Sequence, residues 1–200
     1  RRGSMKLNTP NKLTIARMVI TPVFLALIMW ESLPHRFLIA TLVYSLAAVT
    51  DAIDGKLARK NNQITNFGKL LDPIADKVLT TSALLAFMVM DLCNIWIVMI
   101  VLTREFTIAS IRMLAAAGGV VIPANIWGKI KTVSQMTFTI VIMLLGEVYY
   151  IMGNVNTELF SKLPSLSIIS NSLLWITAIL TVVSGVIYIK DSVKVIDYTK

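Results

Sequence analysis

The chain has 200 residues, of which 56% are hydrophobic, and its mean hydropathy is +0.75. Soluble domains contain roughly 45–50% apolar residues with glycine included, so this composition excludes an ordinary soluble domain and indicates a polytopic membrane protein. A net charge of +8 would be one indication of a protein that binds nucleic acid. Here the basic residues gather in short loops, as a membrane-orientation signal does, so we expect no nucleic-acid partner.

The first residues of the chain and its single cysteine and histidine further limit the possible kinds of protein. Residues 1–4 look like a cloning scar in front of Met5, so we expect residues 5–200 to form a single domain. The single Cys93 excludes a disulfide framework, and the single His35 argues against a zinc site built from histidines.

Six apolar segments follow one another, each about as long as the roughly 20 residues that a membrane-spanning helix needs. The breaks between them hold turn-forming residues such as Pro34, Gly118 and Pro123. We predict an all-α integral membrane fold with six transmembrane helices at residues 12–30, 36–60, 66–90, 93–117, 128–152 and 166–190. The last segment reads as apolar throughout, and we expect it to face lipid or a partner subunit.

An even number of helices places both termini on one side of the membrane. Of the 19 Lys and Arg residues, all but Arg36 and Lys162 fall in loops or helix halves on that side. The positive-inside rule therefore predicts cytoplasmic N- and C-termini. The charged residues also occupy the inner halves of the helices, which predicts a polar cavity in the cytoplasmic half.

Four aspartates lie within the second and third predicted helices. Asp51 and Asp54 are three residues apart and Asp72 and Asp76 are four apart, so each pair shares one face of its helix. An ionised carboxylate at the bilayer centre costs roughly 2.5–3.5 kcal/mol on insertion scales. Hard cations such as Mg²⁺ or Mn²⁺ would compensate four carboxylates together. The pattern therefore favours a site for two divalent metal ions.

Two other interpretations of the aspartates stay open at this stage. Ion pairs within the same two helices would also compensate them, with partners at Lys56, Arg59, Lys69 and Lys77. Acidic residues inside a membrane also line ion pathways, so the alternative from a different class is a divalent-cation transporter.

The residues from Asp51 to Asp76 form the pattern D-x2-D-G-x2-A-R-x8-G-x3-D-x3-D. This pattern resembles the signature of the CDP-alcohol phosphatidyltransferases, and the six-helix layout is similar to that family. The resemblance implies that a CDP-linked lipid donates its phosphatidyl group to an alcohol and releases CMP. It implies that the four aspartates hold two divalent metals, that Asp76 also acts as general base, and that the enzyme is a homodimer. It further implies a CDP-lipid pocket at Asp54, Gly55, Ala58, Arg59 and Gly68.

The segments 10–17, 103–106 and 127–135, together with Arg112, resemble the branch of the family whose acceptor is glycerol 3-phosphate. A phosphorylated acceptor needs cations beyond the metals, and arginine binds phosphate in a bidentate fork. The residues predicted to bind the acceptor phosphate are Arg112, Lys131, Arg104 and Gln135. We expect transfer from CDP-diacylglycerol to glycerol 3-phosphate at a bacterial inner membrane, with inositol phosphate, serine or phosphatidylglycerol as alternative acceptors.

Several of these side chains also have structural alternatives. Arg104 would be satisfied by an ion pair with Glu105, with Asp91 or with an aspartate of the site. Asn11 and Thr14 would either cap the first helix or reach the cytidine of the CDP-lipid. Arg17 would contact either a phosphate of the substrate or a lipid headgroup.

Overall fold

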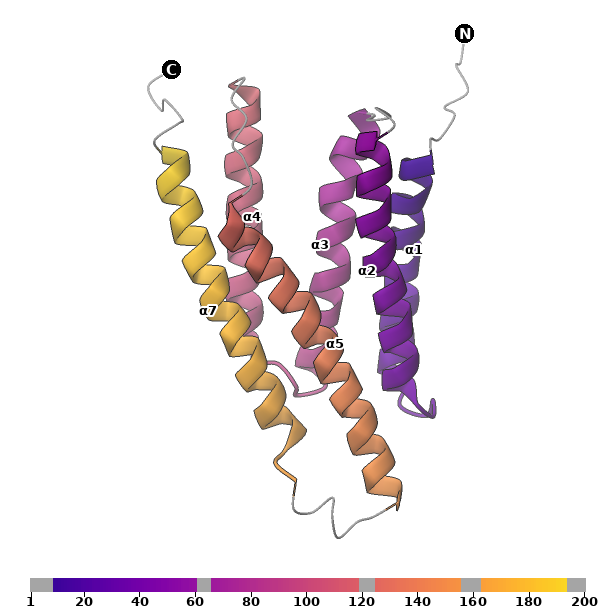
Figure 1. Ribbon diagram of the computed structural model, residues 1–200. Coiled ribbons are helices and arrows are strands. Elements are labelled where there is room, and N and C mark those ends of the chain that lie inside the picture. Colours follow the sequence, from indigo (N-terminus) through magenta and orange to yellow (C-terminus); the bar gives the residue numbers. More distant parts are fainter. Residues whose placement is uncertain (1–8, 61–65, 119–124, 156–162, 194–200) are drawn as a thin grey trace. The chain divides into compact units, whose positions relative to one another are not determined.

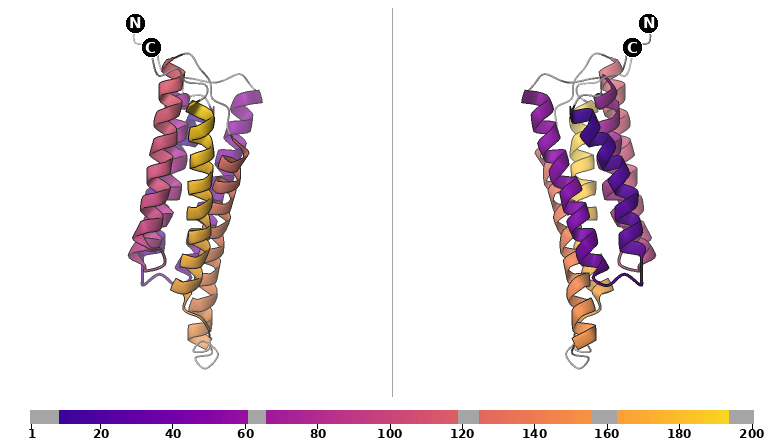
Figure 2. Two further views of the ribbon diagram at one scale, coloured as in Figure 1. Left: turned by 90° about the vertical axis from the view of Figure 1, so that its left-hand side faces the viewer. Right: turned by 90° about the vertical axis from the view of Figure 1, so that its right-hand side faces the viewer.

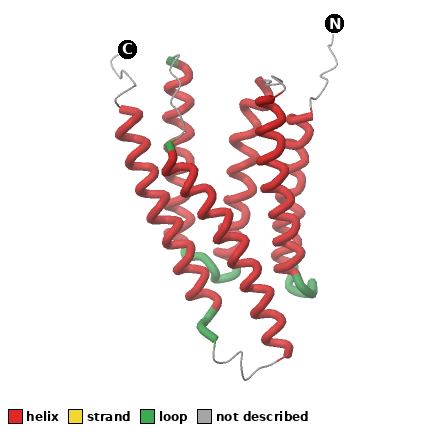
Figure 3. Tube along the Cα trace, viewed as in Figure 1, coloured by secondary structure: helices red, strands yellow, loops and turns green. Residues whose placement is uncertain are grey.

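The computed structural model describes residues 9–60, 66–118, 125–155 and 163–193. Within these ranges it does not describe the side chains of residues 9–13, 51–60, 66–73, 76 and 117. All described residues belong to helices or to the loops that join them, without a strand (Figure 3). The all-α prediction is confirmed.

The described part of the chain contains six helices, and each begins and ends within three residues of its predicted position. Two of them start at an asparagine cap: Asn94 Oδ1 accepts the Trp96 N–H at 3.0 Å, and Asn125 Oδ1 accepts the Trp127 N–H at 3.2 Å. The helices (Figure 1) are α1 (Thr9–Met29), α2 (Arg36–Lys60), α3 (Asn66–Val89), α4 (Ile95–Ala117), α5 (Ile126–Val155) and α7 (Leu166–Val193).

Two of these helices, α5 and α7, are long and apolar enough to cross a membrane. Among the described residues, helices α1, α2 and α3 contain shorter apolar stretches, at Thr14–Met29, Arg36–Thr50 and Lys77–Val89. Many large apolar side chains are exposed, among them Leu46 and Phe106. Extensive apolar surface of this kind marks contact with lipid or with a partner.

Threonines inside the helices satisfy their hydroxyl groups locally. Each donates a hydrogen bond of 2.7–3.0 Å to the backbone carbonyl four residues earlier. Such bonds pair the hydroxyl without a distant partner, which suits helices surrounded by apolar groups. The threonines concerned are Thr21, Thr41, Thr50, Thr107, Thr132 and Thr181.

The helices divide into two compact units. Unit 1 comprises residues 1–86 and 143–160, and in it α1 packs along α2 (Figure 2). The rings of Phe24 and Tyr44 lie 5.5 Å apart between these helices. The C-terminal part of α5 joins the start of α2 through Glu147, whose carboxylate accepts the Leu38 N–H at 3.2 Å and bonds the His35 ring.

Unit 2 comprises residues 87–142 and 161–200, and in it α4 and α7 lie side by side (Figure 2). Their starts are tied together, because the Asn94 N–H donates to Asn171 Oδ1 at 2.7 Å and Ser170 Oγ donates to the Leu92 carbonyl at 2.7 Å. Cys93 is buried in the same turn, and burial raises the pKa of its thiol to about 12. The thiol is therefore protonated and unreactive at neutral pH.

The last helix is apolar enough to cross a membrane, as predicted, but one of its faces is buried and does not face lipid. Residues at helical spacing bury a stripe of mostly small or hydroxyl-bearing side chains against the rest of unit 2. Small residues let helices approach closely, and their hydroxyls bond across or along the helix. The stripe consists of Ser170, Leu174, Thr177, Ala178, Thr181, Ser184, Gly185, Tyr188 and Ser192.

Gly146 on α5 is expected to be required for the packing of unit 1. A Cβ at this position would lie 2.7 Å from Phe37 Cδ1, whereas one at Gly118 would meet only backbone atoms at 3.5 Å or more. Alanine is favoured over glycine inside a helix by about 1 kcal/mol, but overpacking costs about 1–3 kcal/mol. We expect Gly146→Ala to lower the free energy of unfolding and Gly118→Ala to change it by less than about 0.5 kcal/mol.

Thermal unfolding of both variants in the same detergent measures this difference. Equal stability of the Gly146→Ala and Gly118→Ala proteins would contradict the close packing of the Phe37 ring on α5.

Candidate active site

The four aspartates fall on two helices that are joined by a short connection. Asp54 lies six residues before the end of α2 at Lys60, and Asp72 lies six residues after the start of α3 at Asn66. At 1.5 Å per residue, both are ~9 Å from that connection, while Asp51 and Asp76 are ~14 and ~15 Å from it. The backbone therefore places two aspartates on each helix at matching distances from the same end of unit 1.

The side chains of these aspartates lie outside the described residues, as do those of Asn11, Gly55, Ala58, Arg59 and Gly68. Among the side chains that are described, no group of three or more His, Cys, Asp or Glu converges as a metal site. The chemistry of the donor set fits the expected ions, because carboxylate oxygens are the ligands that Mg²⁺ and Mn²⁺ prefer. The two-metal site stays a prediction.

Thr14 and Arg17 lie on one face of α1, and both are only 1% exposed. Because α1 begins at Thr9, Thr14 is inside the helix, and the interpretation of Thr14 as a cap is wrong. The burial of Arg17 likewise excludes a headgroup contact on the outer surface of the helix. Both side chains therefore belong to the interior of unit 1.

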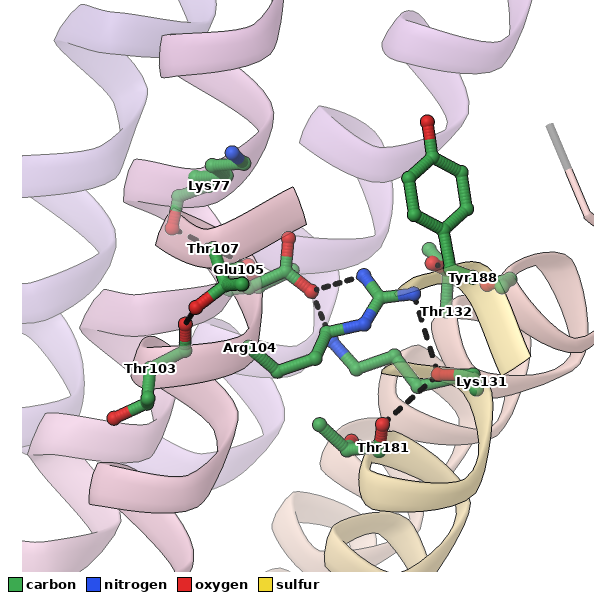
Figure 4. A network of polar contacts seen from close by, with 12 residues as sticks. Lys77, Thr103, Arg104, Glu105, Thr107, Lys131, Thr132, Thr181 and Tyr188 are labelled. Carbon is green, nitrogen blue, oxygen red and sulfur yellow. Dashed lines mark hydrogen bonds and ion pairs between the residues drawn. The ribbon is translucent and has the colours of Figure 1, made fainter. Parts of the chain in front are cut away.

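A cluster of charged residues lies in unit 2, where α4, α5 and α7 supply its members (Figure 4). Glu105 Oε1 accepts hydrogen bonds from Arg104 Nη1 at 3.0 Å and from Lys131 Nζ at 2.6 Å. Arg104 Nη2 donates to Ser184 Oγ on α7 at 3.2 Å. Lys131 is only 3% exposed. We call Arg104, Glu105, Lys131 and Ser184 the basic cluster.

Two glycines make room for the Arg104 side chain. A Cβ at Gly185 on α7 would lie 3.2 Å from Arg104 Cγ, and one at Gly128 on α5 would lie 3.4 Å from Arg104 Nη2. Glycine at both positions permits this close approach of backbone and side chain. On its other side the Arg104 stem forms part of the wall of an open, mostly apolar groove of about 420 Å³ between α4 and α7.

Arg112 is not part of the basic cluster. It lies two turns beyond Arg104 on α4, ~12 Å along the helix axis, and it is exposed. Its guanidinium carbon lies 5.2 Å from the ring centre of the buried Tyr188, and its Nε donates to Tyr188 Oη at 3.1 Å. The structure thus brings together Arg104 and Lys131 and leaves Arg112 apart.

Lys131 bonds Glu105, the neighbour of Arg104 in the chain, and thereby lies beside Arg104. Helix tilt and the reach of a lysine side chain decide such contacts, and neither follows from positions counted along a helix. Gln135, also predicted for this site, is 2% exposed and lies one turn after Lys131 on the same face of α5.

Sequence reasoning considered Glu105 only as a partner of Arg104, and it missed the bond to Lys131. It also missed Ser184 and Tyr188. The spacing of small and hydroxyl residues in the last helix was the signal that points to these two residues. Of the alternatives for Arg104, the structure has the ion pair with Glu105.

Comparison with known proteins defines the class. The family model described as CDP-alcohol phosphatidyltransferase matches residues 7–183. A Bacillus subtilis protein named CDP-diacylglycerol–glycerol-3-phosphate 3-phosphatidyltransferase is 36% identical over 189 residues, which are 89% of this chain and 91% of that protein. A Haemophilus influenzae protein of the same name is 36% identical over 191 residues, 93% of this chain and 94% of its own length. The chain belongs to the CDP-alcohol phosphatidyltransferase family.

The chain is therefore an enzyme of phospholipid biosynthesis with the character of a membrane protein, as the resemblance predicted. Within the family it is of the phosphatidylglycerophosphate synthase type. A Mycobacterium tuberculosis protein named probable phosphatidylglycerophosphate synthase is 38% identical over 130 residues, 64% of this chain and 62% of that protein.

Proposed function

We propose that the enzyme transfers the phosphatidyl group of CDP-diacylglycerol to glycerol 3-phosphate, giving phosphatidylglycerol phosphate and CMP. The names of the relatives from B. subtilis and H. influenzae support this reaction. The observation that carries the acceptor assignment is the basic cluster, in which Arg104 and Lys131 meet around one carboxylate. Arg104 and Lys131 supply two cationic groups of the kind that binds a phosphate. Serine, which has no phosphate, has less use for such a cluster.

The enzyme lies in a bacterial inner membrane, with all six helices crossing it and both termini in the cytoplasm. The polar ends of α2 and α3 line a cavity on that side, and residues 5–200 act as a single domain within a homodimer. The exposed apolar side chains, the spans α5 and α7 and the one-sided distribution of basic residues support this placement.

The aspartates perform the chemistry. Asp51, Asp54, Asp72 and Asp76 hold two Mg²⁺ or Mn²⁺ ions, which when bound neutralise charge on the donor pyrophosphate. Asp76 takes the proton of the acceptor hydroxyl, whose oxygen then bonds the phosphorus of the phosphatidyl group while the bond to CMP breaks.

The remaining predicted residues hold the two substrates. Arg104, Lys131 and Gln135 bind the phosphate of the acceptor. Arg112, also predicted to bind it, lies ~12 Å from Arg104 along α4, so its contribution is tested separately below. The CDP-lipid pocket is formed by Asn11, Thr14, Asp54, Gly55, Ala58, Arg59 and Gly68.

CMP release tests the reaction and the acceptor together. Purified protein with Mg²⁺ and CDP-diacylglycerol is offered glycerol 3-phosphate, serine, inositol phosphate and phosphatidylglycerol in separate assays. We expect CMP only with glycerol 3-phosphate. CMP with another alcohol would overturn the acceptor assignment and keep the aspartate chemistry. Metal flux across sealed vesicles without CMP release would identify a divalent-cation transporter.

The proposed base is tested by Asp76→Asn, which removes the proton acceptor and preserves the size of the side chain. General base catalysis contributes typically 10²–10⁴-fold, so we expect kcat to fall by about that factor while binding of the CDP-lipid is partly retained. Asp91→Asn, in the turn between α3 and α4, is the matched control and should keep normal turnover. Near-normal turnover of Asp76→Asn would remove this residue as the base.

The role of Arg112 is tested by Arg112→Ala. A hydrogen bond to a charged group contributes about 1.5–3 kcal/mol, so we expect KM for glycerol 3-phosphate to rise about tenfold or more while KM for CDP-diacylglycerol changes little. Arg36→Ala, at the start of α2, removes a cation outside the site and should change neither value. Equal effects of Arg112→Ala on both KM values would mean that Arg112 does not bind the acceptor.

A further inference from the structure

We propose that Glu105 is a positioning residue of the acceptor site, which holds Arg104 and Lys131 together so that both cations meet one phosphate. This inference rests on the proposed function, in which the basic cluster binds glycerol 3-phosphate. Glu105 is not one of the four aspartates, and a negative charge is not needed to bind an anionic acceptor. The proposal gives this carboxylate a role.

The geometry of the bonds carries the proposal. Arg104 Nη1 and Lys131 Nζ donate to the same atom, Glu105 Oε1, at 3.0 and 2.6 Å. The two nitrogens therefore lie within about 6 Å of each other. The cations come from different helices, α4 and α5, so Glu105 is the residue that joins them across the helix boundary (Figure 4).

A carboxylate at this point reduces the repulsion between the two cations. Lys131 is only 3% exposed and the Arg104 side chain 14% exposed, so water screens their charges weakly. Two positive charges at this separation repel each other, and the Glu105 carboxylate, bonded to both, offsets part of that repulsion. The shared carboxylate oxygen also directs both donor groups to one point.

Contacts with α7 hold the Arg104 side chain in this position. Ser184 Oγ accepts the second guanidinium nitrogen at 3.2 Å and itself donates to the Thr181 carbonyl at 3.0 Å. The Cγ of Arg104 passes Gly185 at a distance that would place an added Cβ only 3.2 Å away. These contacts fix the stem and one edge of the guanidinium, and Glu105 fixes the edge that faces Lys131.

The contrasting explanation is an ion pair that only stabilises the fold. Such a pair would influence the amount of folded enzyme, or both KM values alike, since it has no particular relation to the acceptor. A positioning role predicts a selective effect on KM for the phosphorylated acceptor. The two explanations therefore differ in a kinetic measurement on folded protein.

Two substitutions test the position and the charge of the carboxylate in turn. Glu105→Asp keeps the charge but withdraws the carboxylate by one methylene group, and Glu105→Gln keeps the size but removes the charge. We expect both to raise KM for glycerol 3-phosphate about tenfold or more and to leave KM for CDP-diacylglycerol essentially unchanged. Glu147→Gln is the matched control, because Glu147 is also a buried carboxylate, 5% exposed, but lies outside the cluster.

The buried thiol of Cys93 reports folding in the same unit, because it stays unreactive toward a thiol reagent while unit 2 is folded. If Glu105→Gln exposes Cys93, the charge-preserving Glu105→Asp decides. Unchanged KM values, or equal changes in both, in a folded Glu105 variant would overturn the positioning role. Failure of the unmodified enzyme to release CMP with glycerol 3-phosphate would instead overturn the proposed function on which this role depends.

Discussion

The cost of burying charge in apolar helices is the constraint on which the described structure depends. Lys131 and Glu147 are both almost fully buried. Lys131 bonds the carboxylate of Glu105, and Glu147 bonds the ring of His35. Leaving one member of such a pair without its partner costs about 3–5 kcal/mol, which is a large part of the stability of a small domain. The positions of neighbouring helices follow from this requirement as much as from apolar packing.

The same constraint makes the aspartates informative from their sequence positions alone. Four carboxylates within the sequence from Asp51 to Asp76 need several cations close by, and the helix bounds place them at matching distances from one end of unit 1. Charges inside apolar segments therefore indicate function more directly than apolar residues do. In α7, by contrast, the apolar composition gave no indication of the buried stripe, whose Ser184 and Tyr188 bond Arg104 and Arg112.

Sequence reasoning located the helices well, because hydropathy and turn residues such as Pro34 and Gly118 mark helix ends locally. It also identified the family, because the aspartate pattern lies within one short segment. It did not find the bond between Lys131 and Glu105 or the position of Arg112 on Tyr188. These contacts depend on the rotation and tilt of helices that are distant in sequence, and neither quantity is encoded in a local pattern.

Glycine has two different uses in the two units. Gly146 leaves space for the aromatic ring of Phe37, so an apolar group fills the gap, whereas Gly185 leaves space for the stem of Arg104, so a charged side chain passes through it. Close approach of helices thus serves packing in unit 1 and the placement of a cation in unit 2.

The adjacency of Arg104 and Glu105 in the chain also bears on how the protein is made. Their ion pair forms within α4 alone, at 3.0 Å, and needs no residue that is synthesised later. In the topology proposed above, in which α4 crosses the membrane, a single arginine at the centre of the helix opposes insertion by roughly 2.5–3.5 kcal/mol, and a counterion on the same helix reduces that penalty. Lys131 and Ser184 come later in the chain, so the partner that Arg104 needs first is the residue next to it.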